Sequence, residues 1–118
     1  MHVEIISIGD ELLIGQTINT NSSWMGEQLS LIGASVHQIT AITDNENHIL
    51  ETLERASKKV DVVLITGGLG PTKDDITKHT LCKFFGTELI FNKDVFSKLE
   101  IFFSSRGFEM LDVNKDQA

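Results

Sequence analysis

The sequence predicts an α/β protein with a mostly parallel sheet, and two observations lead to this fold class. Three short runs rich in β-branched residues have the character of strands, namely His2–Gly9, Ala34–Thr43 and Val60–Thr66. Segments with helical periodicity separate these runs, and such alternation is typical of parallel strands joined by right-handed crossovers. The apolar character of the third run also suits a strand that is buried on both faces of a parallel sheet.

The first predicted helix follows a polar segment, Asp10–Ser23, which leaves the first strand. Its apolar face consists of Met25, Leu29 and Ile32, whose i, i+4, i+7 spacing places them on one side of a helix. Gly33 is a suitable residue to end this helix before the second strand begins.

The second predicted helix follows the second strand. Thr43–Glu46 has the spacing of a capping box, in which the first and last side chains bind backbone N–H groups at the helix start. The apolar stripe behind this box consists of Ile49, Leu53, Ala56 and Val60. We therefore expect a helix that leads directly into the third strand.

Two further helices and one short strand are predicted in the C-terminal half. A third helix ends at Gly86, and the short apolar run Thr87–Phe91 predicts a strand. Asn92 can cap a fourth helix, which Gly107 ends. The apolar faces of these two helices are Ile76, Leu81, Phe84 and Phe85, and then Val95, Leu99 and Phe102.

The chain of 118 residues is long enough for one domain with a real core. Its tail, Val113–Ala118, contains no final strand, so we expect residues 1–118 to be a single domain that is incomplete at its C-terminal end. Missing elements would leave apolar surface or a sheet edge uncovered, and we therefore expect a homo-oligomer.

The overall charge narrows the class of partner. A formal net charge of −7 and a pI of about 4.9 argue against nucleic acid or an anionic membrane as partners, because both reward basic patches. A small phosphorylated ligand remains compatible with this charge. No apolar run approaches the ~20 residues of a membrane span, and the N-terminus is acidic where a secretory signal would be apolar. We therefore expect a cytoplasmic protein, in which the single cysteine, Cys82, is a buried thiol.

Two polar loops follow predicted strands, and ligands of open parallel sheets bind at the carboxyl ends of the strands. In the second loop, Gly67, Gly68 and Gly70 allow φ > 0 and a close backbone approach, so consecutive N–H groups can form an anion-binding nest. A helix starting near Asp74 or Asp75 would direct its positive N-terminus at the same place. The loop has neither the GxxxxGK[ST] nor the GxGxxG pattern.

The acidic pair Asp74 and Asp75 has two explanations that the residues alone leave open. One is helix capping, since acids are common in a first helical turn. The other is a divalent metal ion, because carboxylates beside a phosphate nest would repel the ligand unless a cation lies between them. Asp10 could supply a further oxygen ligand, or it belongs to an ordinary solvated turn. Asn19 and Asn21 can likewise cap the first helix, contact a ligand, or do both.

The two loops together carry a family resemblance. GDELLIGQTINTNS (residues 9–22) and TGGLGPTKDDIT (residues 66–77) resemble the N-terminal domain of the competence/damage-inducible CinA proteins. That domain is part of the wider molybdopterin-binding family of molybdenum-cofactor biosynthesis. The resemblance covers the whole chain and implies a three-layer α/β/α domain around a mainly parallel sheet.

The resemblance also implies roles for particular residues. In molybdopterin-binding members, the TGGTG loop and a following Asp-x-Thr hold a pterin phosphate or a nucleotide. Those positions correspond here to Thr66, Gly67, Gly68 and Gly70, and to Asp75 and Thr77, with Asn21 of the first motif as a further polar contact. Cofactor-synthesis members often carry Arg where this chain has Asp74, which favours the CinA-like branch.

The CinA-like branch implies a metal-dependent ADP-ribose pyrophosphatase. Asp75 and Asp74 are the expected catalytic residues, and together with Asp10 they are the expected ligands of a divalent metal ion. The alternative is a module that binds a nucleotide or a pterin phosphate without hydrolysing it. A third interpretation is an inactive assembly domain.

Overall fold

Three strands form a parallel sheet in the order β2-β1-β3 in the computed structural model, which describes residues 1–70, 72 and 75–118. The strands are β1 (His2–Ile8), β2 (Ser35–Ile42) and β3 (Val62–Thr66), and they confirm the three runs predicted as strands. The last pairs on either side of β1 are Ile8 with Ile42 and Ser7 with Thr66. All three strands therefore end at one edge of the sheet.

Burial is greatest in β1 and smaller in β3. From Val3 to Ile8 every residue of β1 is buried, because β1 lies between the other two strands. The residues of β3 are only partly buried, and within the described residues this strand has a neighbour on one side alone. The prediction of a fully buried third strand was therefore wrong, and the fully buried strand is the first.

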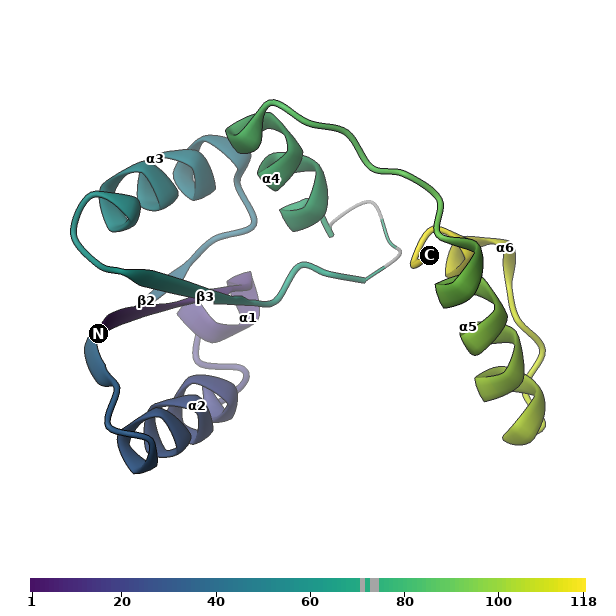
Figure 1. Cartoon of the computed structure of the whole chain (residues 1–118), viewed down its shortest axis with the longest axis horizontal. Helices are drawn as coiled ribbons and strands as arrows, with labels where there is room; N and C mark the ends of the chain where they lie inside the picture. Colours follow the sequence, from purple (N-terminus) through teal and green to yellow (C-terminus); the bar gives the residue numbers. More distant parts are fainter. Residues whose placement is uncertain (71, 73–74) are drawn as a thin grey trace.

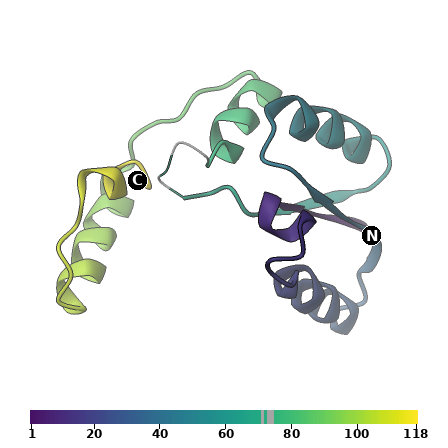
Figure 2. The same ribbon diagram turned by 180° about the vertical axis from the view of Figure 1, so that it is seen from behind.

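The helices cover both faces of the sheet, as the three-layer prediction requires (Figures 1 and 2). Helix α2 (Thr20–Leu31) packs on one face, against β1 and β2. Helices α3 (Glu46–Ser57) and α4 (Thr77–Phe85) pack against each other on the opposite face. A short helix, α1 (Asp10–Leu13), lies within the segment that the sequence predicted only as polar.

The main apolar core lies between the sheet and helices α3 and α4. Its buried members are Ile6 and Ile8 of β1, Ile42 of β2, and Ile49, Leu53 and Ala56 of α3. Side chains alternate along a strand, so Val3, Ile5 and Ser7 face the opposite layer. The Ser7 hydroxyl bonds with the side chain of Asn19, at the start of α2, which agrees with this placement.

Three predicted helix boundaries need correction. Helix α3 is capped by Asn45, whose side chain accepts a hydrogen bond from the His48 N–H at 3.1 Å, and not by Thr43. The helix ends at Ser57, so Val60 lies beyond its apolar stripe. Helix α2 ends at Leu31, which leaves Ile32 outside the predicted face and 74 % exposed.

The predicted strand at Thr87–Phe91 is absent from the structure, where this segment has neither helix nor strand. Helix α5 (Lys93–Ser105) then begins as predicted, because the Asn92 side chain accepts hydrogen bonds from the N–H groups of Asp94 and Val95. A short helix that was not predicted, α6 (Asp112–Lys115), follows. In both views α5 and α6 lie to one side of the sheet layers.

Helix α4 ends as the sequence predicts. Gly86 has φ 63°, the left-handed conformation common just after a helix. Cys82 of this helix is half-buried, so the prediction of a buried thiol holds only in part. Within the described residues, no helix has both the length and the apolar character that a membrane span needs.

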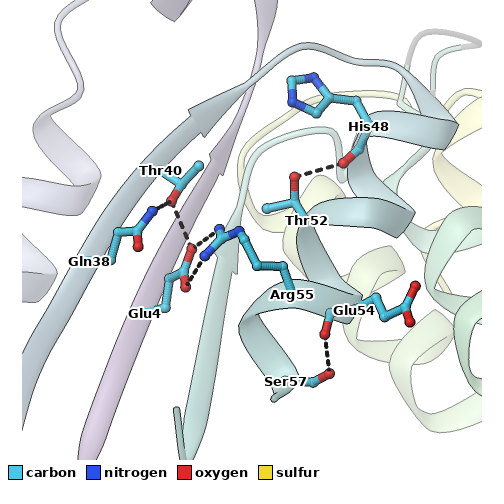
Figure 3. A network of polar contacts seen from close by, with 8 residues as sticks. All are labelled: Glu4, Gln38, Thr40, His48, Thr52, Glu54, Arg55 and Ser57. Atoms are coloured by element: carbon cyan, nitrogen blue, oxygen red, sulfur yellow. Dashed lines mark hydrogen bonds and ion pairs between the residues drawn. The ribbon is translucent and has the colours of Figure 1, made fainter. Parts of the chain in front are cut away.

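An ion pair between a buried carboxylate and a partly exposed guanidinium joins β1 to α3 (Figure 3). Glu4 is fully buried, and its two carboxylate oxygens accept hydrogen bonds from the Arg55 guanidinium at 2.5 and 3.1 Å. The Thr40 hydroxyl donates a third bond to Glu4 at 2.8 Å and itself accepts one from the Gln38 side chain. Burial alone would raise the pKa of Glu4, but the bonds from Arg55 and Thr40 outweigh it and hold the pKa below its usual value.

Candidate functional site

Three loops meet at the edge where the parallel strands end. Gly9 and Asp10 follow β1, Thr43 and Asp44 follow β2, and a glycine loop, residues 67–70, follows β3. Ligands of open parallel sheets bind at this edge. The candidate site therefore contains the two loops predicted from the sequence and a third, after β2, that was not considered.

At two positions of the glycine loop, only glycine fits the backbone conformation and the space available. Gly67 and Gly68 have φ 96° and 62°, in the left-handed region that favours glycine. A Cβ on Gly67 would collide with the backbone carbonyl of Ile8, and a Cβ on Gly68 would collide with the Thr77 hydroxyl. The predicted positive φ is thus confirmed at both positions. The close backbone approach seen in the structure is to Ile8 and Thr77 of this chain, and the approach to a ligand stays a prediction.

Gly70 differs from the prediction. It does not share the positive φ of the other two loop glycines. A Cβ at this position would lie 2.5 Å from Oδ2 of Asp75, so the absence of a side chain makes room for the Asp75 carboxylate. The role of Gly70 in this structure is therefore to let Asp75 fold back against the loop.

Thr77 supports the glycine loop from the start of α4. It is fully buried, its hydroxyl donates to the Gly67 carbonyl at 3.0 Å, and its N–H donates to the Gly68 carbonyl at 3.2 Å. Helix α4 begins at Thr77, so the prediction of a start near Asp74 or Asp75 was wrong. Support of the loop is the observed role of Thr77, and a direct contact with a ligand stays a prediction.

Asp75 precedes α4 and forms a small turn of its own. Its carboxylate accepts hydrogen bonds from the Thr72 hydroxyl and, at 3.1 Å, from the Thr72 N–H. The Thr72 hydroxyl is the main reason that the pKa of Asp75 lies below its usual value, and Lys78 adds a smaller effect. Asp75 therefore does not cap α4, and an ionised carboxylate is held beside the glycine loop. Asp74 lies outside the described residues.

Asp10 connects the loop after β1 to the loop after β2. Its Oδ1 atom accepts hydrogen bonds from the Thr43 hydroxyl and, at 3.2 Å, from the Asp44 N–H. The Thr43 hydroxyl thus contacts Asp10, while Asn45, two residues later, caps α3. The bonds also bring a third carboxylate, Asp44, to the site.

Asp44 is the site residue that the sequence analysis missed. Its partial burial raises its pKa, and the negative charges of Asp10, Glu11 and Asp75 raise it further. One of its oxygens would lie 3.7 Å from a Cβ on Gly68, so Asp44 is close to the glycine loop. The position after the end of β2 was the available signal, because all parallel strands end at the same edge.

Asn21 and Thr66 lie together although 45 residues separate them. The Asn21 amide donates to the Thr66 hydroxyl at 3.3 Å, and both residues line a cavity of about 120 Å³ that Gly67 also borders. Asn19 caps α2, accepting a hydrogen bond from the Ser22 N–H. Of the two predicted roles, capping is thus observed for Asn19, whereas Asn21 faces the end of β3.

The donors around the loop suit a divalent cation only in part. Asp10, Asp44 and Asp75 supply oxygen atoms, and the charges of Asp10 and Asp75 add to the effect of burial in raising the pKa of Asp44. However, no three His, Cys, Asp or Glu side chains within residues 1–70, 72 and 75–118 lie close enough to surround an ion. Such an arrangement fits Mg²⁺, which binds one or two carboxylates and completes its shell with water and ligand phosphates.

The fold and this edge define an α/β domain with a glycine loop and carboxylates at the carboxyl ends of a parallel sheet. The chain belongs to the family described as the probable molybdopterin binding domain, whose sequence model matches residues 4–114. The resemblance noted in the sequence is thereby confirmed at the level of the family.

Curated relatives include proteins several times longer than this chain. A CinA-like protein of Flavobacterium psychrophilum is 51% identical over 122 residues, a match that covers all of this chain and 28% of the relative. A putative competence-damage inducible protein of Caldicellulosiruptor saccharolyticus is 43% identical over 118 residues, with 29% of its length covered. The chain thus spans less than a third of the length of these relatives.

Solved structures support the same fold. The protein CinA of Thermoplasma acidophilum, described as of unknown function, superposes with a TM-score of 0.81 at 27% identity, covering 98% of this chain and 68% of that one. The tungsten cofactor synthesizing protein MoaB of Pyrococcus furiosus gives a TM-score of 0.65 at 28% identity, covering 76% of this chain and 56% of that one.

Gly68→Val tests the glycine loop. We expect a loss of ~1–3 kcal/mol in unfolding free energy, because the new side chain combines positive φ with a collision against Thr77. A ligand whose phosphate contacts this loop should bind much more weakly to the variant, and AMP serves as the probe. Gly86→Val is the matched control, since Gly86 has φ 63° but nothing within 4 Å of its Cβ position. Equal AMP affinity in the two variants, measured by calorimetry, would mean that the loop does not contact the ligand.

Proposed function

We propose that this chain is a metal-dependent domain that hydrolyses the pyrophosphate bond of ADP-ribose or a related nucleoside diphosphate. The observation that carries the proposal is the meeting of Asp10, Asp44 and Asp75 around the glycine loop. The choice of substrate comes from the resemblance of the two loop motifs to the CinA-like branch, which implies an ADP-ribose pyrophosphatase. The reaction would use one water molecule and release AMP and ribose 5-phosphate.

The glycine loop would bind the phosphates. Gly67 and Gly68 leave the backbone of the loop without side chains, and backbone N–H groups in such loops suit anions. Helix α4, of nine residues, starts directly behind the loop at Thr77, so the positive end of its dipole lies on the same side. Both features favour binding of a diphosphate at the carboxyl end of β3.

The carboxylates would position a divalent cation and the attacking water. Asp75 is suited to this because the bonds from Thr72 keep it ionised and fixed in direction. Asp10 reaches the same region from β1 and is fixed by Thr43 and Asp44. A divalent cation bound there would polarise the phosphate oxygens and lower the pKa of a bound water.

A second candidate function is binding of a nucleotide or a pterin phosphate without hydrolysis. The observation that favours it is the lack, in the described part of the chain, of three metal-ligating side chains around one point. A glycine loop and the pair Asn21 and Thr66 would suffice to hold a phosphate.

One experiment separates the two functions. ADP-ribose is titrated into the protein with and without Mg²⁺, and the release of AMP is followed. Release of AMP that requires Mg²⁺ supports the hydrolase. Saturable binding without AMP in either condition supports the binding module, and the absence of both binding and AMP would contradict both.

Asp44→Asn tests the cation without any measurement of activity. Because Asp44 is repelled by three neighbouring carboxylates, its neutral replacement should raise the unfolding free energy by about 0.5 kcal/mol in the absence of metal. Mg²⁺ should raise the melting temperature of the original protein more than that of the variant. Asp94→Asn, at an exposed acid in α5, is the control. The same Mg²⁺ effect in all three proteins would contradict a cation at this site.

A further inference from the structure

A second and larger cavity adjoins the glycine loop. It has a volume of about 460 Å³ and lies between Gly70, Thr72 and the start of α4 on one side and Leu89–Phe91 and Lys115–Ala118 on the other. One hydrogen bond joins the two walls, and another joins the two segments of the second wall. The Lys78 ammonium donates to the Asp116 carbonyl at 2.8 Å, and the Asn92 N–H donates to the Ala118 carbonyl at 2.7 Å.

The cavity is continuous with the candidate phosphate site. Gly70 and Asp75 belong to the glycine loop and its carboxylate, and both also line the larger cavity. A ligand whose phosphates lie at the loop would therefore extend directly into this cavity. The smaller cavity beside Asn21 has about 120 Å³, which is too small for a nucleoside, whereas ligand cavities of drug-sized molecules start near ~300 Å³.

The lining combines apolar side chains with charged groups of both signs. Leu89, Ile90 and Phe91 are 51 %, 81 % and 59 % exposed, so the wall presents an apolar surface with one aromatic ring. Lys78, His79 and Lys115 supply N–H donors, and Asp75 and Asp116 supply acidic groups. A flat aromatic base can stack on a phenyl ring, while donors and acceptors nearby can bond to the polar edge of the base.

We infer that this cavity binds the nucleobase of the nucleotide whose phosphates lie at the glycine loop, with Phe91 as the stacking residue. The inference rests on the proposed function for the presence of phosphates at the loop, but it concerns binding of the base and not hydrolysis. It also gives a role to Leu89–Phe91, a segment that has neither helix nor strand and exposes three large apolar side chains.

The test compares a ligand that has a base with one that lacks it. Affinities for AMP and for ribose 5-phosphate are measured by calorimetry on the original protein and on Phe91→Ala. We expect AMP to bind at least about tenfold more tightly than ribose 5-phosphate, on the scale of one base–aromatic contact. Phe91→Ala should remove most of this difference and leave the affinity for ribose 5-phosphate unchanged.

The control is Phe108→Ala, at a phenyl ring that is 67 % exposed and does not line the cavity. Ile90→Ser is a second variant of the same wall and should also weaken AMP alone. Equal affinity for AMP and ribose 5-phosphate in the original protein, or unchanged AMP affinity in Phe91→Ala, would overturn the inference. Since neither ligand has a pyrophosphate bond, a failure of hydrolysis would remove the proposed function and leave this result intact.

Discussion

Asp75→Asn is expected to lower the rate of AMP release from ADP-ribose by about 10²–10³-fold, the scale on which a lost electrostatic contact to a transition state is felt. The substitution keeps the size of the side chain, and its amide oxygen can still accept a bond from Thr72. It removes the negative charge of the Asp75 carboxylate, which hydrogen bonds from Thr72 hold beside the glycine loop. The metal concentration needed for half-maximal rate should rise, while the melting temperature should change little.

The measurement is the rate of AMP release as a function of Mg²⁺ concentration, together with a thermal melt. Asp94→Asn, in α5, provides the control for loss of one exposed carboxylate. The same change at Asp74 should have a smaller effect, because the Asp-x-Thr pattern of the family falls on Asp75 and Thr77. Normal turnover in Asp75→Asn, or a larger loss at Asp74, would mean that the metal and the water are held elsewhere.

Arg55→Met is expected to cost about 3 kcal/mol of unfolding free energy, the lower end for removal of one partner of a buried ion pair, because Glu4 is fully buried but the Arg55 side chain is 33 % exposed. Glu4 has no exposed surface, and both of its oxygens accept bonds from Arg55. Without the guanidinium, its charge would remain in the interior with only the Thr40 hydroxyl as a partner. The loss is measured by urea unfolding at neutral pH.

The same helix contains a matched control. Lys58, the residue directly after α3, pairs with Glu54 of that helix. These two side chains are 70 % and 66 % exposed, so Lys58→Met should cost less than ~1 kcal/mol of unfolding free energy. Replacing both members of the buried pair, as Glu4→Leu with Arg55→Met, should recover most of the loss. Equal effects at Arg55 and Lys58 would show that the buried pair contributes little.

The pH dependence follows from the lowered pKa of Glu4. In the original protein this carboxylate stabilises the fold above its usual pKa near 4.5, and the contribution is lost as the pH falls through the lower folded value. In Arg55→Met, burial without the cation should raise the pKa of Glu4, so its protonation at low pH removes the cost of an unpaired charge. The difference in stability between the two proteins should therefore shrink on acidification.

The elements that the sequence predicted correctly depend on local patterns. Strand β1 could be predicted from its β-branched run, and α5 from Asn92 and the apolar spacing behind it. The run Thr87–Phe91 has the same apolar character but forms no strand in the structure. A strand requires a partner at its edge, and a local pattern contains no information about that partner.

The candidate site could be predicted where a motif marked it and not where only tertiary contacts define it. The positive φ of Gly67 and Gly68 follows from their residue type. Asp44 belongs to no recognisable motif, and only its position after β2 indicated the site. It enters the site through its bond to Asp10, 34 residues earlier in the chain. The start of α4 was misplaced because Asp75 binds Thr72 instead of capping the helix.

The low burial of helix α5 affects the order in which parts of the molecule unfold. The structure describes all residues of α5, and none of them is buried. Ile101 and Phe102 are 69 % and 46 % exposed. A segment with so few buried contacts can detach as its own cooperative unit while β1 and its neighbours stay folded. Since the segment before α5 forms one wall of the larger cavity, a molecule bound there would add its binding free energy to the cost of that detachment. The attachment of α5 to the rest of the molecule and the binding of a ligand in the cavity would then be thermodynamically coupled.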